Sequence, residues 1–151
     1  MLNHLSGKMA EHLLTNEFRS RKQFSLFAFF TGVKDDTELN IIDFRERIAF
    51  QRENDKQIEI DVKAESSCGR VILVEVKKTQ MKTGLKMVED FHEKTATYAK
   101  SFPDQKILPA FLSLGGFTDE EKQFCEEKGI ATAEKIMFFQ IEENANYNKG
   151  D

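Results

Sequence analysis

The stretch that decides the fold is residues 57–78, which read QIEIDVKAESSCGRVILVEVKK. In its first part, apolar and polar residues alternate, and this is the pattern of a strand with one buried face. Its second part contains the unbroken apolar block 71–74, which is typical of a strand covered on both faces. A short polar link joins the two parts. The stretch therefore predicts an antiparallel hairpin.

Four charged residues belong to the far end of this hairpin. If Asp61 lies opposite Glu75, then Glu59 lies opposite Lys77, and all four side chains share one face because residues two apart do so. One interpretation is the solvated face of an edge strand. In a covered strand, however, such charges are costly unless each has a partner or a metal. Carboxylate oxygens suit Mg²⁺, and a nearby lysine can orient a water and offset charge on a phosphate. The cluster favours metal-assisted phosphodiester hydrolysis.

The spacing of Asp61, Glu75 and Lys77 resembles the PD-(D/E)xK signature of the restriction-endonuclease-like nucleases, in the form D-x13-E-x-K. Ile60 stands where that signature has proline. The resemblance extends over residues 7–132 and is to uncharacterised bacterial members of the superfamily. It implies an α/β fold with a three-layer core, in which helices flank a central mixed β-sheet.

The resemblance also implies a Mg²⁺ or Mn²⁺ site. Its ligands would be two carboxylates, a backbone carbonyl and an acidic residue of the first helix: Asp61, Glu75, Val76 and Glu11. Lys77 would position the attacking water, and Glu59 would add a ligand or a base. A solvated helix surface is the alternative interpretation for Glu11, because most helical glutamates are merely exposed.

The candidate contacts to nucleic acid lie after the hairpin. Lys94 and Tyr98 are four residues apart on a predicted helix and resemble the Q-x-x-x-Y motif of exonuclease-type relatives, with lysine in place of glutamine. Lys78, next to the E-x-K motif, is the third candidate contact. These residues are expected to steady a phosphate backbone.

Together these features predict a metal-dependent nuclease that acts on nucleic acid, with DNA as the expected substrate. The alternative is a catalytically inactive nuclease-like module that binds nucleic acid or a partner protein. A homodimer, and a chain that is the C-terminal part of a longer protein with its N-terminal region missing, both stay open.

Composition limits the other classes of protein. The 151 residues are 40% hydrophobic and 32% charged, which indicates a single globular domain over 1–151 with flexible ends at 1–6 and 143–151. The net charge of −4 disfavours strong non-specific binding of nucleic acid over the whole surface. The two cysteines lack the spacing of a zinc site or a disulfide framework. We find no apolar run of about 18 residues for a membrane span and no signal peptide, and we expect a cytoplasmic protein.

The remaining elements follow from periodicity and turn signals. Residues 24–30 allow a strand or a short helix, and Ser25 as a possible N-cap favours the helix. Arg45 and Arg47 share one face of a predicted strand, where one of them is expected to contact the substrate backbone. Besides the hairpin, we predict helices over 2–21, 84–101 and 118–128, strands over 41–52, 107–114 and 130–133, and a final strand or helix over 134–142.

Overall fold

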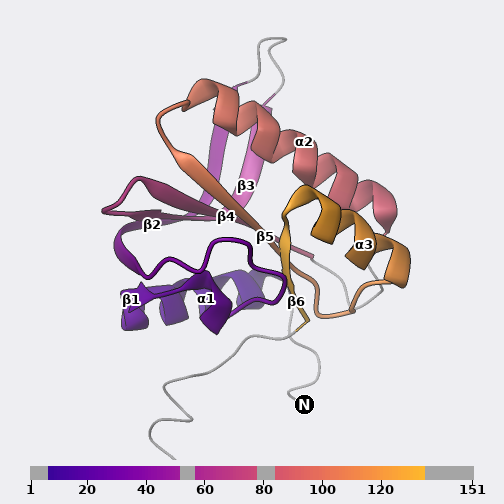
Figure 1. Ribbon diagram of the computed structural model, residues 1–151, viewed down its shortest axis with the longest axis horizontal. Coiled ribbons are helices and arrows are strands. Elements are labelled where there is room, and N and C mark those ends of the chain that lie inside the picture. The colour runs from indigo at the N-terminus through magenta and orange to yellow at the C-terminus, as the bar shows by residue number, and fades with distance from the viewer. Residues whose placement is uncertain (1–6, 52–56, 78–83, 135–151) are drawn as a thin grey trace, which may run out of the picture.

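The computed structural model describes residues 7–51, 57–77 and 84–134, and these form one curled mixed sheet with helices on both faces (Figure 1). The strand order in the sheet is β1-β2-β3-β4-β5-β6. Along the chain the elements are α1 (Gly7–Arg21), β1 (Gln23–Phe24), the 3-10 helix η1 (Leu26–Ala28), β2 (Leu39–Gln51), β3 (Gln57–Ser66), β4 (Arg70–Val76), α2 (Leu85–Ser101), β5 (Lys106–Leu112), α3 (Asp119–Lys128) and β6 (Ala131–Ala133). The α/β fold with a central mixed sheet confirms the prediction from the sequence.

The sheet separates two apolar clusters. On the α1 face the buried side chains include Leu14, Phe18, Val62, Ile72 and Val74. On the face covered by α2 and α3 they include Ile60, Leu73, Val88, Phe91 and Phe111. Alternate residues of β4 therefore enter opposite clusters, as the unbroken apolar block predicted. Each cluster buries the apolar side of its helices, and this burial is the main favourable contribution to folding.

The hairpin has the predicted register. Strands β3 and β4 are antiparallel, with Val62 opposite Val74 and Glu65 opposite Val71, whereas β4 and β5 run parallel. The recorded β3–β4 ladder ends at Val62 and Val74, one residue before Asp61 would meet Glu75. The two strands thus separate where the charged residues begin.

The segment after α1 combines a strand and a helix. Gln23 and Phe24 pair with β2 as a short strand, whereas the sequence allowed a strand over 24–30 but favoured the helix. The predicted short helix is confirmed for η1, where the Ser25 Oγ accepts a hydrogen bond from the Phe27 backbone N–H at 3.2 Å. The two interpretations of residues 24–30 therefore each hold for part of the segment.

The later elements agree with prediction to within a few residues. The capping box of Thr118 and Glu121 begins α3, and Gly129 ends it with a φ of 74°. The expected element over 134–142 lies outside the described residues apart from Glu134, and so do residues 2–6 of the first predicted helix. Among the described helices none is both long and apolar enough to cross a bilayer.

Aromatic packing of α1 against η1 gives a first prediction. Phe18 is 0% exposed, and its ring centroid lies 5.2 Å from those of both Phe24 and Phe29. Phe18→Ala should therefore lower the free energy of unfolding by about 3–5 kcal/mol. Phe27, which is 68% exposed, is the control, and Phe27→Ala should change it by less than about 0.5 kcal/mol. Equal losses in urea unfolding of the two variants would contradict this core assignment.

Candidate functional site

The separation of β3 from β4 is made by a side chain. Asp61 is 5% exposed, and its Oδ2 accepts a hydrogen bond from the Val76 backbone N–H at 2.8 Å. In a regular antiparallel ladder a backbone carbonyl of the neighbouring strand accepts such an N–H. Here the carboxylate takes that place, so β4 keeps its hydrogen bond while the strands diverge. Asp61 thereby reaches sideways to β4, instead of projecting from one face as the simple hairpin predicted.

Strand β2 reverses its faces at the same level. Glu46 pairs with Val62 and Ile48 pairs with Ile60, but Arg47 between them has a φ of 55°. This left-handed conformation is sparsely populated for a residue with a side chain and costs about 1–3 kcal/mol. Its consequence is that side chains before and after Arg47 pack on opposite faces of the sheet.

Residues of one parity, which share a face in a regular strand, here enter different clusters. Phe44 packs with the α1 cluster, whereas Ile48 and Phe50 pack with the α2 and α3 cluster. The strained residue therefore lies where β2 turns over beside Asp61. Strain of this kind collects at functional sites more often than elsewhere.

Glu11 reaches this region from α1. Its side chain is 1% exposed, and its Oε2 accepts a hydrogen bond from the Arg47 Nε at 3.2 Å. Arg47 in turn acts on Asp61: burial raises the pKa of that carboxyl, and the Arg47 charge is one of the smaller influences that oppose the rise. The structure thus links Glu11 to the motif through Arg47. The sequence predicted Glu11 as a candidate but gave no reason to expect that Arg47 would bind it.

Glu75 is half-buried and pairs with a cation from α2. Its side chain is 18% exposed, and its Oε2 lies 3.3 Å from the Nζ of Lys94 on α2. The same Nζ donates to the backbone carbonyl of Glu59 at 3.1 Å. Over residues 7–51, 57–77 and 84–134, the buried Glu75 Oε1 has no hydrogen-bond partner. Lys94 therefore bridges the motif glutamate and β3, a role that the sequence did not predict.

Burial raises the pKa of both motif carboxyls. Burial, followed by the charge of Asp61, raises the pKa of Glu75 to about 7, while Lys94 opposes the rise. Burial also raises the pKa of Asp61, although the Val76 N–H and Lys94 act in the opposite direction. Two carboxylates that share a site of low polarity cannot both ionise without a nearby positive charge. The pair is thus suited to take up a proton or a cation.

The donor set fits a hard divalent cation. No group of three or more His, Cys, Asp and Glu side chains that could hold a metal occurs in the described part of the chain. Mg²⁺, however, is usually held by one or two carboxylates and keeps several waters. Asp61 and Glu75 supply that number, and no described residue hydrogen-bonds the buried Oε1 of Glu75. The arrangement meets the requirement with carboxylates alone.

The carboxylate that acts on Lys77 is not Glu59, which the sequence placed opposite it. Lys77 is 4% exposed, its backbone N–H donates to the Leu112 carbonyl at 2.9 Å, and its Nζ has no hydrogen-bond partner among the described residues. Burial lowers the pKa of Lys77, and the carboxylate that opposes this is Glu121 of α3. Glu59, the residue expected opposite Lys77, is exposed, and Glu75 pairs with Lys94. Lys77 is thus coupled electrostatically to α3.

The candidate nucleic-acid contacts are placed unevenly. Tyr98 is 1% exposed, its ring stacks on Phe102 with centroids 4.5 Å apart, and its hydroxyl donates to Gln105 Oε1 at 2.8 Å. A contact of this hydroxyl with phosphate would require that hydrogen bond to break.

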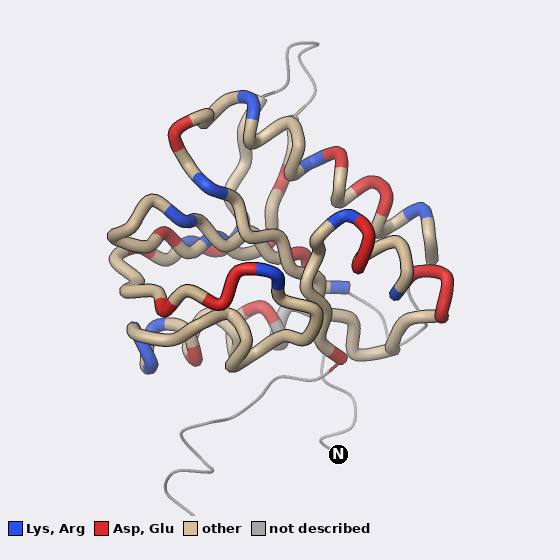
Figure 2. Tube along the Cα trace, viewed as in Figure 1, with Lys and Arg blue, Asp and Glu red and all other residues tan. Residues whose placement is uncertain are grey.

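The two candidate lysines differ in their surroundings. Lys94 is half-buried and pairs with Glu75, and Lys78 lies outside the described residues. Acidic and basic residues are interspersed along α2 and α3 (Figure 2). The basic residues of these helices therefore form no continuous positive surface within the described residues.

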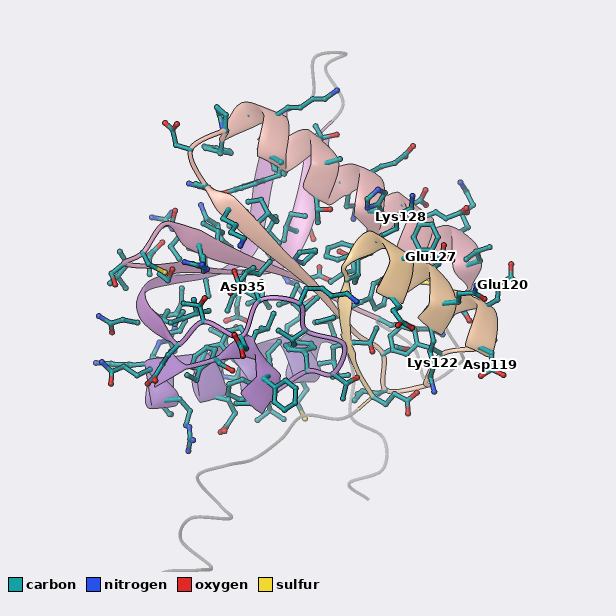
Figure 3. The ribbon with its side chains drawn as sticks, in the orientation of Figure 1. Asp35, Asp119, Glu120, Lys122, Glu127 and Lys128 are labelled. Carbon is teal, nitrogen blue, oxygen red and sulfur yellow. The ribbon has the colours of Figure 1, made fainter. Side chains whose placement is uncertain are left out.

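A second charged cluster lies at the other end of β4. Asp35 accepts hydrogen bonds from Arg70 Nε at 2.7 Å and from Thr37 Oγ1 at 2.6 Å, and its Oδ2 lies 2.8 Å from Lys106 Nζ (Figure 3). Lys106, followed by the other two residues, holds the pKa of Asp35 well below its usual range. The cluster ties the loop before β2 to the starts of β4 and β5. Three side chains already bind the Asp35 carboxylate, so the role of this cluster is to stabilise the fold.

Comparison with known proteins identifies the fold. No family model matches the sequence, and no curated protein matches it. A solved protein of unknown function, AF1548, aligns with a TM-score of 0.60 and 18% identity over 83% of this chain and 56% of its own. Can2 from Sulfobacillus thermosulfidooxidans, solved with cyclic tetra-adenylate, aligns with a TM-score of 0.60 and 16% identity over 85% of this chain and 32% of its own.

The third comparison is with EndoMS in complex with double-stranded DNA, with a TM-score of 0.50 and 16% identity over 86% of this chain and 46% of its own. The chain has a restriction-endonuclease-like fold. Identities this low show the fold alone. The chain also spans only about a third to a little over half of the length of these three solved chains.

The carboxylate pair gives a second prediction. In metal-free buffer, NMR titration should give Glu75 a pKa of about 7, well above its usual 4.5. Asp61→Asn should lower this pKa because it removes the neighbouring negative charge, and Lys94→Met should raise it further. Because the folded pKa exceeds the unfolded one, folding takes up a proton between these values, and the free energy of unfolding should fall as pH rises from 4.5 to about 7. A Glu75 that titrates near 4.5 in every variant would contradict the described burial.

Proposed function

We propose that the chain is a Mg²⁺- or Mn²⁺-dependent nuclease that hydrolyses phosphodiester bonds, with DNA as the first substrate to test. The observation that carries this proposal is the pair of the buried Asp61 and the half-buried Glu75 at the point where β3 and β4 separate. The buried Oε1 of Glu75 has no hydrogen-bond partner among the described residues. An ordinary surface hairpin has no reason to bury two like charges together. A cation site gives both of them a use.

Asp61 and Glu75 would hold the metal, and the Val76 carbonyl would be a third oxygen. When bound, the metal would polarise the phosphate and lower the pKa of a water. Asp61 is already oriented for this role by the Val76 N–H, and Lys94 fixes one oxygen of Glu75 while leaving the other available. Such preorganisation lowers the cost of assembling the site on binding.

The chain's other residues would act on the water and the phosphate. The Lys77 ammonium would orient the attacking water and offset the negative charge that develops on the phosphate. Glu59, exposed beside the pair, would serve as a base or an additional ligand, and Glu11 would act through Arg47. Lys78 and Lys94 would contact the backbone of the substrate, and the Tyr98 hydroxyl would join them only after releasing Gln105.

The solved structures support the choice of substrate class. EndoMS was solved with double-stranded DNA and Can2 with cyclic tetra-adenylate, and both ligands contain phosphodiester bonds. The net charge of −4 supports recognition through a local basic region rather than through a strong field over the whole surface. Double-stranded DNA is therefore the first substrate to test, followed by single-stranded DNA and RNA.

Removal of Asp61 tests the proposal. Asp61→Asn should reduce metal-dependent cleavage by on the order of 10²–10³-fold or more, because it removes a metal ligand. Its amide oxygen can still accept the Val76 N–H, so the free energy of unfolding should change by less than about 1 kcal/mol. Asp43→Asn is the matched control, because Asp43 on β2 pairs with the exposed Arg45, and it should cleave like the wild type. Rates on labelled duplex DNA with Mn²⁺, and thermal melts, are the measurements.

Two outcomes would overturn the proposal. Full activity of Asp61→Asn would mean that the metal site lies elsewhere. A wild-type protein that binds Mn²⁺ through Glu75 in calorimetry, yet leaves duplex DNA, single-stranded DNA and RNA intact, would instead favour the catalytically inactive binding module.

Lys77 gives a separate prediction. Lys77→Met, which keeps the buried stem but removes the charge, should lose on the order of 10²-fold or more in cleavage rate. Its affinity for Mn²⁺ at pH 8 should remain within about threefold, because the lysine is not a metal ligand. An undiminished rate per folded molecule would remove Lys77 from the mechanism.

A further inference from the structure

Glu121 on α3 is a buried acid whose charge needs an explanation. It is 1% exposed, and its Oε2 accepts a hydrogen bond from the Thr118 backbone N–H at 2.7 Å and another from the Thr118 hydroxyl. This completes the capping box. A glutamine serves that motif as well as a glutamate does, because both offer the side-chain oxygen that it requires. Capping alone therefore does not account for a buried negative charge.

The helix dipole does not account for it either. Negative charge near a helix N-terminus is favourable by about 0.3–1 kcal/mol. Asp119 and Glu120 already supply that charge in the same turn of α3, and both are exposed, with their side chains at the outer edge of the molecule (Figure 3). Burying a third carboxylate costs more than this gain unless a cation compensates it. A specific positive partner is expected.

The second oxygen of Glu121 faces the interior. Among the described residues its Oε1 is buried without a hydrogen-bond partner. The negative charge is felt by Cys125, whose pKa is raised to about 11 by burial and, next, by Glu121. The same negative charge acts on Lys77, whose buried Nζ also has no hydrogen-bond partner among the described residues. Lys77 and Glu121 are thus two buried groups of opposite charge, each with a polar atom that none of the described residues hydrogen-bonds.

The fold explains how these two residues come together. Lys77 follows β4 and hydrogen-bonds through its backbone to Leu112, the last residue of β5. The chain then passes through a short connection to Thr118, the N-cap of α3. The first turn of α3 therefore lies at the edge of the sheet where the E-x-K motif ends. Glu121 is the residue of that turn which points inward.

We propose that Glu121 is a positioning residue for Lys77: its inward oxygen compensates the buried ammonium and directs it toward the site of the attacking water. The proposal rests on the proposed nuclease function for its kinetic consequence, but the pairing of the two charges stands independently of cleavage. Glu121 touches neither substrate nor metal in this arrangement. It acts only through the lysine.

The test uses a substitution that keeps the cap. Glu121→Gln preserves the volume of the side chain and the acceptor for the Thr118 N–H, and it removes only the charge. Glu120→Gln is the matched control, because it removes the same charge from the same turn at an exposed position. Cleavage by Glu121→Gln should show kcat lowered by about tenfold or more with KM within about twofold, as expected for an effect confined to the transition state. Glu120→Gln should match the wild type in both.

A double-mutant cycle supplies the readout that does not need activity. Glu121→Gln and Lys77→Met should each lower the melting temperature, because each leaves the partner charge buried alone. The double variant should melt above the value expected from adding the two losses, since it buries neither charge. In the Lys77→Met background, Glu121→Gln should not lower any residual kcat further.

The outcomes separate the two proposals. Additive losses of melting temperature, or an unchanged kcat in Glu121→Gln, would overturn the positioning role even if the wild type cleaves DNA. A coupled cycle in a protein that cleaves none of the substrates would uphold the pairing of Lys77 and Glu121 while refuting both the nuclease function and the kinetic role.

Discussion

The hydrogen bond from the Val76 N–H to the Asp61 carboxylate is the interaction on which the site depends. A side chain here replaces the backbone acceptor of the neighbouring strand, so β3 and β4 can separate without leaving a buried N–H unpaired. The strained Arg47 on β2 turns its strand over at the same level. Because a side-chain oxygen replaces a backbone acceptor, the two strands of the hairpin separate at the level of the two motif carboxylates.

Burial then makes this branch chemically unusual. Two carboxylates in a site of low polarity require a nearby positive charge. The two helices on the same face of the sheet each contribute one charged residue to this region. Helix α2 contributes Lys94, which pairs with Glu75, and α3 contributes Glu121, which acts on the motif lysine. The hydrophobic layers on both faces hold this network at a fixed geometry, because α2 and α3 pack on the cluster that lies directly beside it.

Much of this could be predicted from local sequence. Three patterns depend only on neighbouring residues: the alternation in β3, the apolar block of β4 and the capping box at Thr118. The first two predicted the hairpin and its register correctly, and the third predicted the start of α3. The strand interpretation of residues 24–30 was not favoured, because the pairing of β1 with β2 is tertiary. The pairs of Arg47 with Glu11 and of Lys94 with Glu75 join residues 36 and 19 positions apart, and no local spacing announces them. The influence of Glu121 on Lys77 was not predicted for the same reason, since a strand pattern gives the face of a residue but not which helix covers that face.

Anomalous scattering from crystals of the protein soaked in Mn²⁺ locates a bound metal without reference to activity. If the carboxylates of Asp61 and Glu75 form a cation site, one strong peak should lie between them, with metal–oxygen distances of about 2.1–2.2 Å. The peak should be absent from crystals of Asp61→Asn. A peak elsewhere in the molecule, or carboxylates of Asp61 and Glu75 that stay free of Mn²⁺ at saturating concentration, would refute this site.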